Sequence, residues 1–164
     1  MKVCITYYSR TGNTAKVANL LSDFLKDKGM KTELYRIKPK KDPGIIIGTL
    51  KSIRGQKIEI EEFDPDDFDF ICIGTPVWAD NPHPSINYLI DEYLPNDIKT
   101  ALFCTLKSDR YDSCLQKIKG RLKLKNAEIL AEEGFNMKKF NDDSEDKLTH
   151  RVSEYAETVA KNLK

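Results

Sequence analysis

Short apolar runs alternate with amphipathic segments from one end of the chain to the other. Five of these runs are bounded by turn residues and have the composition of buried strands. They cover residues 3–8, 32–37, 68–74, 100–106 and 128–132. Apolar residues between them recur at helical spacing, over residues 17–25, 86–94, 115–118 and 148–163. This alternation predicts an α/β fold with right-handed crossovers and a parallel sheet covered by helices on both faces.

Turn-forming residues mark where these helices should begin and end. Gly29 follows the first helical stripe, and a glycine at that point suits a left-handed C-cap. The third stripe is short, and we expect its helix to end near Gly120. Ser144 precedes the last stripe and is a candidate N-cap for the C-terminal helix.

The segment 38–62 is the least regular part of the pattern. Pro39, Pro43 and Gly44 interrupt it, and a short helix ending at Gly55 is expected over its aliphatic residues. These are Ile45, Ile46, Ile47, Leu50 and Ile53. Because a crossover helix must bury one face, we expect these side chains to cover the sheet. An apolar surface for a partner is the alternative.

Length and composition indicate one domain over residues 1–164. A chain of this length buries roughly 70% of the surface that it exposes when unfolded. Charged residues make up 32% of it, and no apolar run approaches the roughly 20 residues of a membrane span. Because the first strand begins directly after Lys2, we expect no signal peptide. A soluble, cytoplasmic protein without a membrane partner is therefore expected.

Charge and cysteine usage exclude several classes of function. The formal net charge is +1 and lysines are interspersed with acids, so a nucleic-acid partner is not expected. The four cysteines form no CxxC pair, and we expect buried free thiols at Cys4, Cys72, Cys104 and Cys114. His83 and His150 lie apart from them, so the sequence predicts no metal site.

The stretch 9–14 joins the first strand to the first helix and carries the strongest chemical signal. It contains four neutral hydrogen-bonding side chains, one arginine and one flexible glycine: Ser9, Arg10, Thr11, Gly12, Asn13 and Thr14. A helix N-terminus has unpaired N–H groups and favours an anion by about 0.3–1 kcal/mol. The nucleotide-hydrolysing pattern would need a lysine after Gly12, and a dinucleotide fingerprint would need three glycines. A single terminal phosphate fits better. The alternative is that Asn13 or Thr14 merely caps the helix.

This stretch resembles the phosphate loop of flavodoxins, which bind the 5′-phosphate of FMN with hydroxyls and backbone amides. The resemblance implies a single-domain, three-layer flavodoxin-like sandwich with a five-stranded parallel sheet in the order 2-1-3-4-5. It also implies FMN as cofactor. Ligands of such sheets bind beyond the carboxyl ends of the strands, so the loops after strands 1, 3 and 4 should meet there.

Two later loops resemble loops of the same family. The pattern Gly74-x-Pro76-x-Trp78 resembles the flavodoxin loop that sets an aromatic ring beside the isoalloxazine, although Trp78 alone would suggest ordinary packing. The implied cofactor contacts there are Thr75, Pro76, Val77, Trp78, Ala79 and Asn81. After the fourth strand they are Thr105, Leu106, Lys107, Ser108 and Tyr111. This second match is partial, because Lys107 and Arg110 add positive charge and no glycine is present. His83 is expected to close the turn.

The resemblance implies an electron carrier that shuttles electrons between a reductase and an acceptor protein, as a monomer or weak dimer. No catalytic triad or acid–base pair is evident, which suits a carrier. The alternative is an FMN-dependent NAD(P)H:quinone or related small-acceptor oxidoreductase, so the sequence leaves enzyme activity open. The near-neutral charge of the chain favours this oxidoreductase, because electron-carrying flavodoxins are strongly acidic. A receiver domain of the same topology would need acids after the first strand, where Tyr8 and Ser9 stand.

Overall fold

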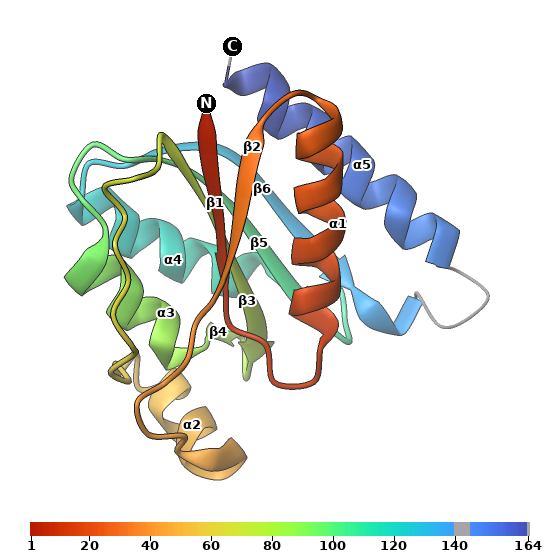
Figure 1. Ribbon diagram of the computed structural model, residues 1–164. Coiled ribbons are helices and arrows are strands. Elements are labelled where there is room, and N and C mark those ends of the chain that lie inside the picture. Colours follow the sequence, from red (N-terminus) through yellow and green to blue (C-terminus); the bar gives the residue numbers. More distant parts are fainter. Residues whose placement is uncertain (140–144, 164) are drawn as a thin grey trace.

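The sheet forms the middle of three layers in the computed structural model, which describes residues 1–139 and 145–163 (Figure 1). Its strands are β1 (Lys2–Tyr7), β2 (Lys31–Arg36), β3 (Phe70–Trp78), β4 (Asn81–Pro82), β5 (Lys99–Leu106) and β6 (Glu128–Asn136). Five of them are parallel in the order β2-β1-β3-β5-β6, while β4 pairs antiparallel with β3. The predicted fold and strand order are confirmed.

Helices cover both faces of this sheet. They are α1 (Asn13–Asp27), α2 (Gly44–Ile53), α3 (Pro84–Tyr88), α4 (Asp112–Leu124) and α5 (Glu145–Asn162), with the π-helical turn η1 (Leu89–Tyr93) and the 3₁₀ turn η2 (Met137–Lys139). α1 and α5 pack on one face, and α3, η1 and α4 pack on the other (Figure 1). The central strands are therefore buried on both sides, which explains why they read as continuous apolar runs.

The predicted helix ends are partly right. Gly29 has φ 83° just after α1, as expected for a left-handed C-cap. The expectation that the third helix ends near Gly120 is wrong, because α4 continues to Leu124. The buried Leu122 extends the apolar stripe by one turn, so packing outweighs the low helix propensity of one glycine. The proposed cap Ser144 lies outside the described residues.

The third strand is longer than its sequence pattern predicted. It continues through Trp78 and turns into β4, with Trp78 opposite Asn81. Ala79 and Asp80 make the turn with φ 49° and 62°, the combination of a two-residue type I′ hairpin. The expectation that the strand ends at Gly74 and a loop follows is therefore wrong, because Val77 and Trp78 find backbone partners in β4.

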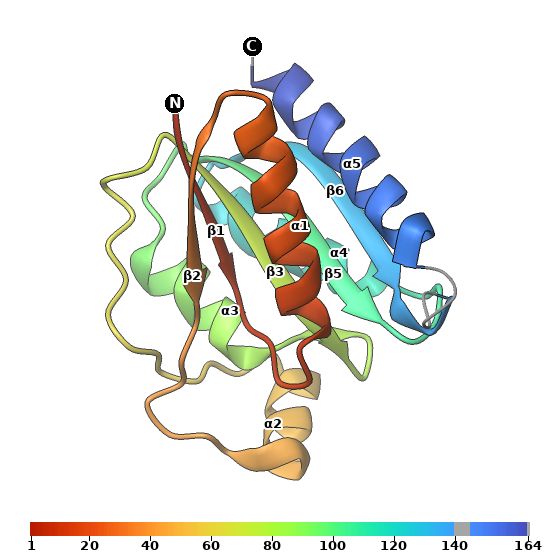
Figure 2. The same ribbon diagram turned by 45° about the vertical axis from the view of Figure 1, so that its right-hand side comes forward.

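The isoleucines of the second crossover do not cover the sheet, so that expectation is also wrong. α2 projects beyond the carboxyl ends of the strands instead of lying on a face (Figures 1 and 2). Only Gly48 and Ser52 of this helix are buried. The covering is done by the later part of the crossover, where Ile58, Ile60 and Phe63 are buried.

The cysteines are all free and buried, which confirms the prediction. Cys4, Cys72 and Cys104 lie in strands and Cys114 lies in α4. Burial raises the pKa of the Cys4 thiol to about 12 and also raises the pKa of Cys72. These thiols therefore stay protonated and act as small apolar side chains.

Candidate functional site

The chain leaves β1 and enters α1 through a tight loop at the carboxyl edge of the sheet. Gly12 occupies the N-cap position with φ 93°, a left-handed conformation that side chains with a Cβ rarely adopt. Ser9 Oγ accepts a hydrogen bond from Ala15 N at 3.3 Å, and Gly12 O accepts one from Lys16 N at 2.9 Å. Capping by Asn13 or Thr14 is therefore wrong, because Gly12 holds the cap position without a side-chain bond.

The first N–H groups of α1 stay open in this arrangement. Within residues 1–139 and 145–163, the N–H groups of Gly12, Asn13 and Thr14 make no hydrogen bond. Thr11 and Gly12 are exposed and Asn13 is half-buried, so the open end of the helix faces solvent. Such an end is suited to bind an anion through backbone donors.

A buried hydrogen bond ties this loop to the end of β5. Thr14 Oγ1 and Thr105 Oγ1 lie 2.7 Å apart, and both side chains are buried. The structure thus brings together two predicted site residues that are far apart in the sequence. It also shows that the Thr14 hydroxyl points into the protein toward β5 and already has a partner.

Arg36 is a residue of this region that the sequence analysis missed. It ends β2 in register with Tyr7 and donates from Nη2 to Ser9 O at 2.8 Å. The available signal was its place at the carboxyl end of the strand beside β1. Arg10 lies nearby and pairs with Asp42 at 3.4 Å.

A hollow of about 450 Å³ adjoins the loop on the β2 side. Three cations and one acid lie among its lining residues, which are Tyr8, Ser9, Arg10, Arg36, Ile37, Lys38, Pro39 and Asp42. The pKa of Asp42 is lowered, first by the hydrogen bond from Gly44 N and further by Arg10. The loop therefore sits beside a surface of positive charge, which favours an anion at the α1 N-terminus.

Trp78 belongs to an aromatic cluster at the end of β3. Tyr8 and His83 stack with ring centroids 3.6 Å apart, and Trp78 meets them edge-on at 6.2 and 4.7 Å. A Cβ at Gly48 would lie 2.6 Å from Trp78 Cζ3, so the ring also contacts α2. Trp78 is half-buried and already has packing partners, as this residue considered alone suggested.

His83 closes the turn after β4, as predicted. Its backbone N donates to Thr75 Oγ1 at 3.0 Å, and its Nδ1 accepts from Ser85 N at 3.3 Å and pairs with Ser85 Oγ at 2.7 Å. Burial lowers the pKa of His83 to about 3, so the ring is neutral at physiological pH. Its Nε2 is buried and has no partner within the described residues.

The remaining predicted residues of the second loop lie along the hairpin. Pro76 and Val77 are half-buried in β3, Ala79 is exposed at the turn, and Asn81 is buried in β4. Asn81 Oδ1 accepts a hydrogen bond from Lys117 Nζ at 2.5 Å. The hairpin is thereby fixed to α4.

The loop after β5 divides between exposed and packed side chains. Lys107 and Ser108 are exposed, whereas Leu106 is buried. Tyr111 lies against β6, since a Cβ at Gly134 would come within 2.2 Å of its ring. In the sheet, β5 lies between β3 and β6. Tyr111 therefore packs over β6, whereas the β3–β4 hairpin lies on the other side of β5.

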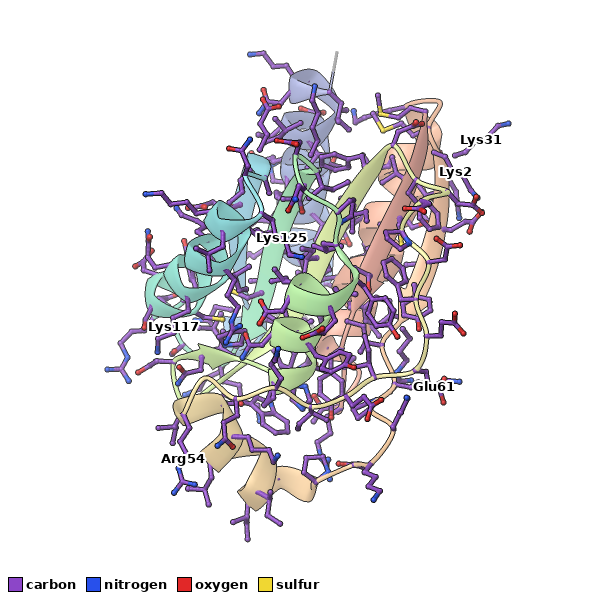
Figure 3. All side chains as sticks on the ribbon, turned by 90° about the vertical axis from the view of Figure 1, so that its left-hand side faces the viewer. Lys2, Lys31, Arg54, Glu61, Lys117 and Lys125 are labelled. Carbon is purple, nitrogen blue, oxygen red and sulfur yellow. The ribbon has the colours of Figure 1, made fainter. Side chains whose placement is uncertain are left out.

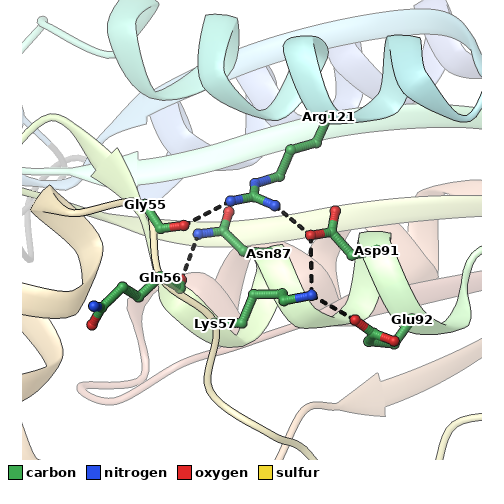
Figure 4. Close-up of polar contacts among 7 residues, drawn as sticks. All are labelled: Gly55, Gln56, Lys57, Asn87, Asp91, Glu92 and Arg121. Carbon is green, nitrogen blue, oxygen red and sulfur yellow. Dashed lines mark hydrogen bonds and ion pairs between the residues drawn. The ribbon is translucent and has the colours of Figure 1, made fainter.

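A polar network anchors α2 next to the hairpin (Figure 4). Arg121 donates to Gly55 O at 2.7 Å and to Asp91 at 2.5 Å, which joins the end of α2 to η1 and α4. Asn87 donates to Gln56 O at 2.9 Å. The end of α2 is therefore fixed to α3, η1 and α4, which cover one face of the sheet.

Neither a metal-binding cluster nor a membrane-spanning helix is found in the described residues. Across the described ranges, no group of three or more His, Cys, Asp or Glu residues could hold a metal ion. None of the helices in those ranges is long and apolar enough to cross a membrane.

Comparison with solved structures identifies the class of fold. The chain is similar to a flavoprotein from Lactobacillus acidophilus NCFM in complex with FMN, with 23% identity over 88% of this chain and 98% of that chain and a TM-score of 0.64. It is also similar to the Streptococcus pneumonia TIGR4 flavodoxin, with 17% identity over 98% of each chain and a TM-score of 0.64. The two-electron reduced flavodoxin of Megasphaera elsdenii matches with 20% identity, over 93% and 98% of the chains, at 0.59.

These matches show that the chain has a flavodoxin-like fold. The resemblance seen in the sequence is thereby confirmed at the level of the fold. No protein-family model matches the sequence, and no curated protein matches it.

Proposed function

We propose that this protein binds FMN at the carboxyl edge of its sheet and carries electrons between redox partner proteins, a reductase and an acceptor. The observation that carries the proposal is the open N-terminus of α1, with Gly12 at its cap and no side-chain cap bond. It lies at the end of β1, where open α/β sheets bind ligands. A similar structure was solved in complex with FMN.

The residues of the first loop fit a terminal phosphate. Backbone N–H groups of Gly12, Asn13 and Thr14 and the exposed Thr11 hydroxyl would donate to it, while Arg10 and Arg36 supply positive charge nearby. Ser9 Oγ and Thr14 Oγ1 have internal partners. Their proposed role is to hold the loop in shape.

The flavin ring would extend from the phosphate toward the ends of β3 and β5. Bound FMN would supply the redox chemistry, and the protein would bind and orient it. The Trp78 ring and the backbone of residues 75–79 are the proposed contacts on one side, and the exposed Lys107 and Ser108 are those on the other. His83 would stay neutral beneath Tyr8 and so add no charge near the ring.

The test of the proposal is a comparison of FMN with riboflavin, which lacks the phosphate. We expect FMN to bind at least tenfold more tightly, with quenching of its fluorescence. Gly12→Val should remove most of this preference, because a β-branched side chain cannot adopt φ 93° without strain of roughly 1–2 kcal/mol. Gly120→Val is the control, since Gly120 lies in α4 with nothing within 4 Å of its Cβ position.

Equal affinity for FMN and riboflavin would show that the loop does not bind the phosphate. A failure of both flavins to bind would contradict the proposal as a whole. Circular dichroism of each variant distinguishes loss of the site from loss of the fold.

A second candidate function is an FMN-dependent reductase that takes electrons directly from NAD(P)H and passes them to a quinone or similar small acceptor. The cations around the site favour it, because the exposed Lys107 and Arg110 could attract an anionic donor. Addition of NAD(P)H alone to the FMN-loaded protein separates the two functions. Rapid bleaching of the flavin supports the reductase, and bleaching only with an added reductase protein supports the carrier.

A further inference from the structure

The α2 helix carries an unusual concentration of exposed aliphatic side chains. Their exposed fractions are 59% for Ile45, 79% for Ile46, 54% for Ile47, 47% for Leu50 and 56% for Ile53. Among the described residues, the only other exposed large apolar side chains are Met1, Leu34 and Leu124. We call the five residues of α2 the isoleucine face.

The structure holds this face outward. On its inner side α2 has only the small residues Gly48 and Ser52, and Gly48 contacts Trp78. Its C-terminal end is fixed by the bond from Arg121 to Gly55 O (Figure 4). The helix stands beyond the sheet in both views, so no described element covers its outer side (Figures 1 and 2).

Positive charge surrounds the isoleucine face. The segment 38–57 contains six of the 27 basic residues of the chain and one of its 26 acidic residues. Lys41, Lys51 and Arg54 have no acidic partner in the part of the chain that the structure describes, and Arg54 points away from the body (Figure 3). Lys40 and Lys57 pair with Glu59 and Glu92.

Four of these lysines line a hollow of about 390 Å³ beside α2. Its lining residues are Lys40, Lys41, Pro43, Lys51, Lys57, Ile58 and Glu59. The hollow therefore combines four cations with a single acid, next to a helix whose outer side is aliphatic. A ligand that fits both features has an anionic head and an apolar body.

We infer that the isoleucine face docks on an anionic phospholipid surface, with its aliphatic side chains in the acyl boundary and its lysines at the headgroups. Helices that bind in this plane combine an apolar face with Lys and Arg around it. Each cation near an anionic bilayer adds about a fivefold gain in binding. The sequence predicted no membrane partner because no run could span a bilayer, but a helix lying in the interface needs no such run.

A second copy of the chain fits this surface less well. The isoleucine face consists of five partly exposed side chains, a small surface beside the roughly 800 Å² that each partner of a stable complex buries. Lys41, Lys51 and Arg54 of two copies would also face one another across a two-fold interface. An acidic protein would satisfy the charge, but it would have to supply a groove for a convex helix, whereas a bilayer needs no preformed shape.

The first experiment is co-sedimentation of the full chain with lipid vesicles, with and without FMN. We expect binding to vesicles of phosphatidylcholine mixed with phosphatidylglycerol, little binding to phosphatidylcholine alone, and weaker binding at high salt. The inference does not rest on flavin binding, so it survives if FMN has no effect. Absence of binding to the mixed vesicles overturns it.

Matched variants test whether the isoleucine face makes the contact. Ile46→Gln with Ile53→Gln should lower the partition coefficient at least tenfold, because two aliphatic side chains no longer enter the lipid. Leu34→Gln is the control, since it removes an aliphatic side chain that is 40% exposed on β2, in none of the hollows beside α2. Equal loss in the variant and the control overturns the inference.

A second pair of variants tests the charge. Lys41→Gln with Arg54→Gln should weaken binding roughly fivefold for each residue, whereas Lys31→Gln with Lys123→Gln removes two exposed cations elsewhere and should leave it unchanged.

Two outcomes would assign the surface to another partner and overturn the inference. One is a concentration-dependent dimer in sedimentation velocity that the isoleucine variant abolishes, without vesicle binding. The other is binding to polyglutamate as tight as to the mixed vesicles and unaffected by the isoleucine variant.

Discussion

At the scale of single residues, two contacts shape the candidate phosphate loop. The Thr14–Thr105 pair fixes the start of α1 to the end of β5, and Arg36 holds the backbone of Ser9. The sequence indicated Thr14 and Thr105 as site residues. Their mutual bond could not be predicted, because it depends on the strand order that brings the two loops to one edge.

Removing one partner of the Thr14–Thr105 hydrogen bond should lower the free energy of unfolding more than removing the second partner afterwards. Thr105→Val leaves the buried Thr14 hydroxyl without its partner and should lower the free energy of unfolding by about 1–3 kcal/mol. Adding Thr14→Val should cost less than a second loss of the same size, since no polar group then remains unpaired. Urea unfolding of both single variants and the double variant measures this coupling. If the losses in the two single variants add up to the loss in the double variant, the two hydroxyls are not hydrogen-bonded.

His83 should make stability depend on pH. Its folded pKa of about 3 lies below the roughly 6.5 of the unfolded chain, so between these values the unfolded state binds the extra proton. Its contribution is therefore complete above pH 6.5 and is lost as the pH falls toward 3, by at most about 1.4 kcal/mol per pH unit. Urea unfolding from pH 7 to pH 4 measures the slope.

The His83→Asn variant can still cap α3 but has no titrating ring, so its stability should vary less over this pH range. His150→Asn is the comparison variant, because it replaces the other histidine of the chain, whose side chain is exposed on α5. Identical slopes for the wild type and His83→Asn would contradict the burial of a neutral ring.

At the scale of elements, periodicity located the strands and most helices, because burial on two faces gives continuous apolar runs. Periodicity did not predict the position of a segment that has no sheet to pack against. The residues of α2 have the composition of a covering helix, yet the crossover carries them past the sheet and uses Ile58, Ile60 and Phe63 for the core. The β3–β4 hairpin was missed since its turn, Ala79-Asp80, lacks the usual Asn-Gly signal.

That turn offers a prediction at the same scale. Ala79 adopts φ 49°, a conformation that Asn tolerates better than Ala. Ala79→Asn should therefore raise the free energy of unfolding by about 0.5–1 kcal/mol, measured by urea denaturation. Thr49→Asn is the contrasting variant, because it places Asn in the helical backbone of α2, where no such gain is expected. A loss of stability in Ala79→Asn would mean that the turn is not left-handed.

At the scale of the whole molecule, the layers and strand order followed from the alternation of strands and helices together with the resemblance to flavodoxins. The fold comparison supports both. Charge distribution was less accessible from sequence. A net charge of +1 conceals a basic region around α2, because acids elsewhere in the chain offset it.

The two apolar cores lie on opposite faces of one sheet and share its strands. We therefore expect the chain to unfold in one cooperative transition, as a single domain does. Far-UV circular dichroism and Trp78 fluorescence should give the same urea midpoint. Separate midpoints would indicate that residues 1–164 form more than one folding unit.

The bond between Thr14 and Thr105 also sets a time order for the making of the protein. Its two residues are 91 positions apart, and β1, β3 and β5 must pair before they can meet. Contacts of such separation form only after the intervening chain has been ordered. During synthesis, the candidate phosphate loop therefore acquires its final support only after a further 91 residues have followed Thr14.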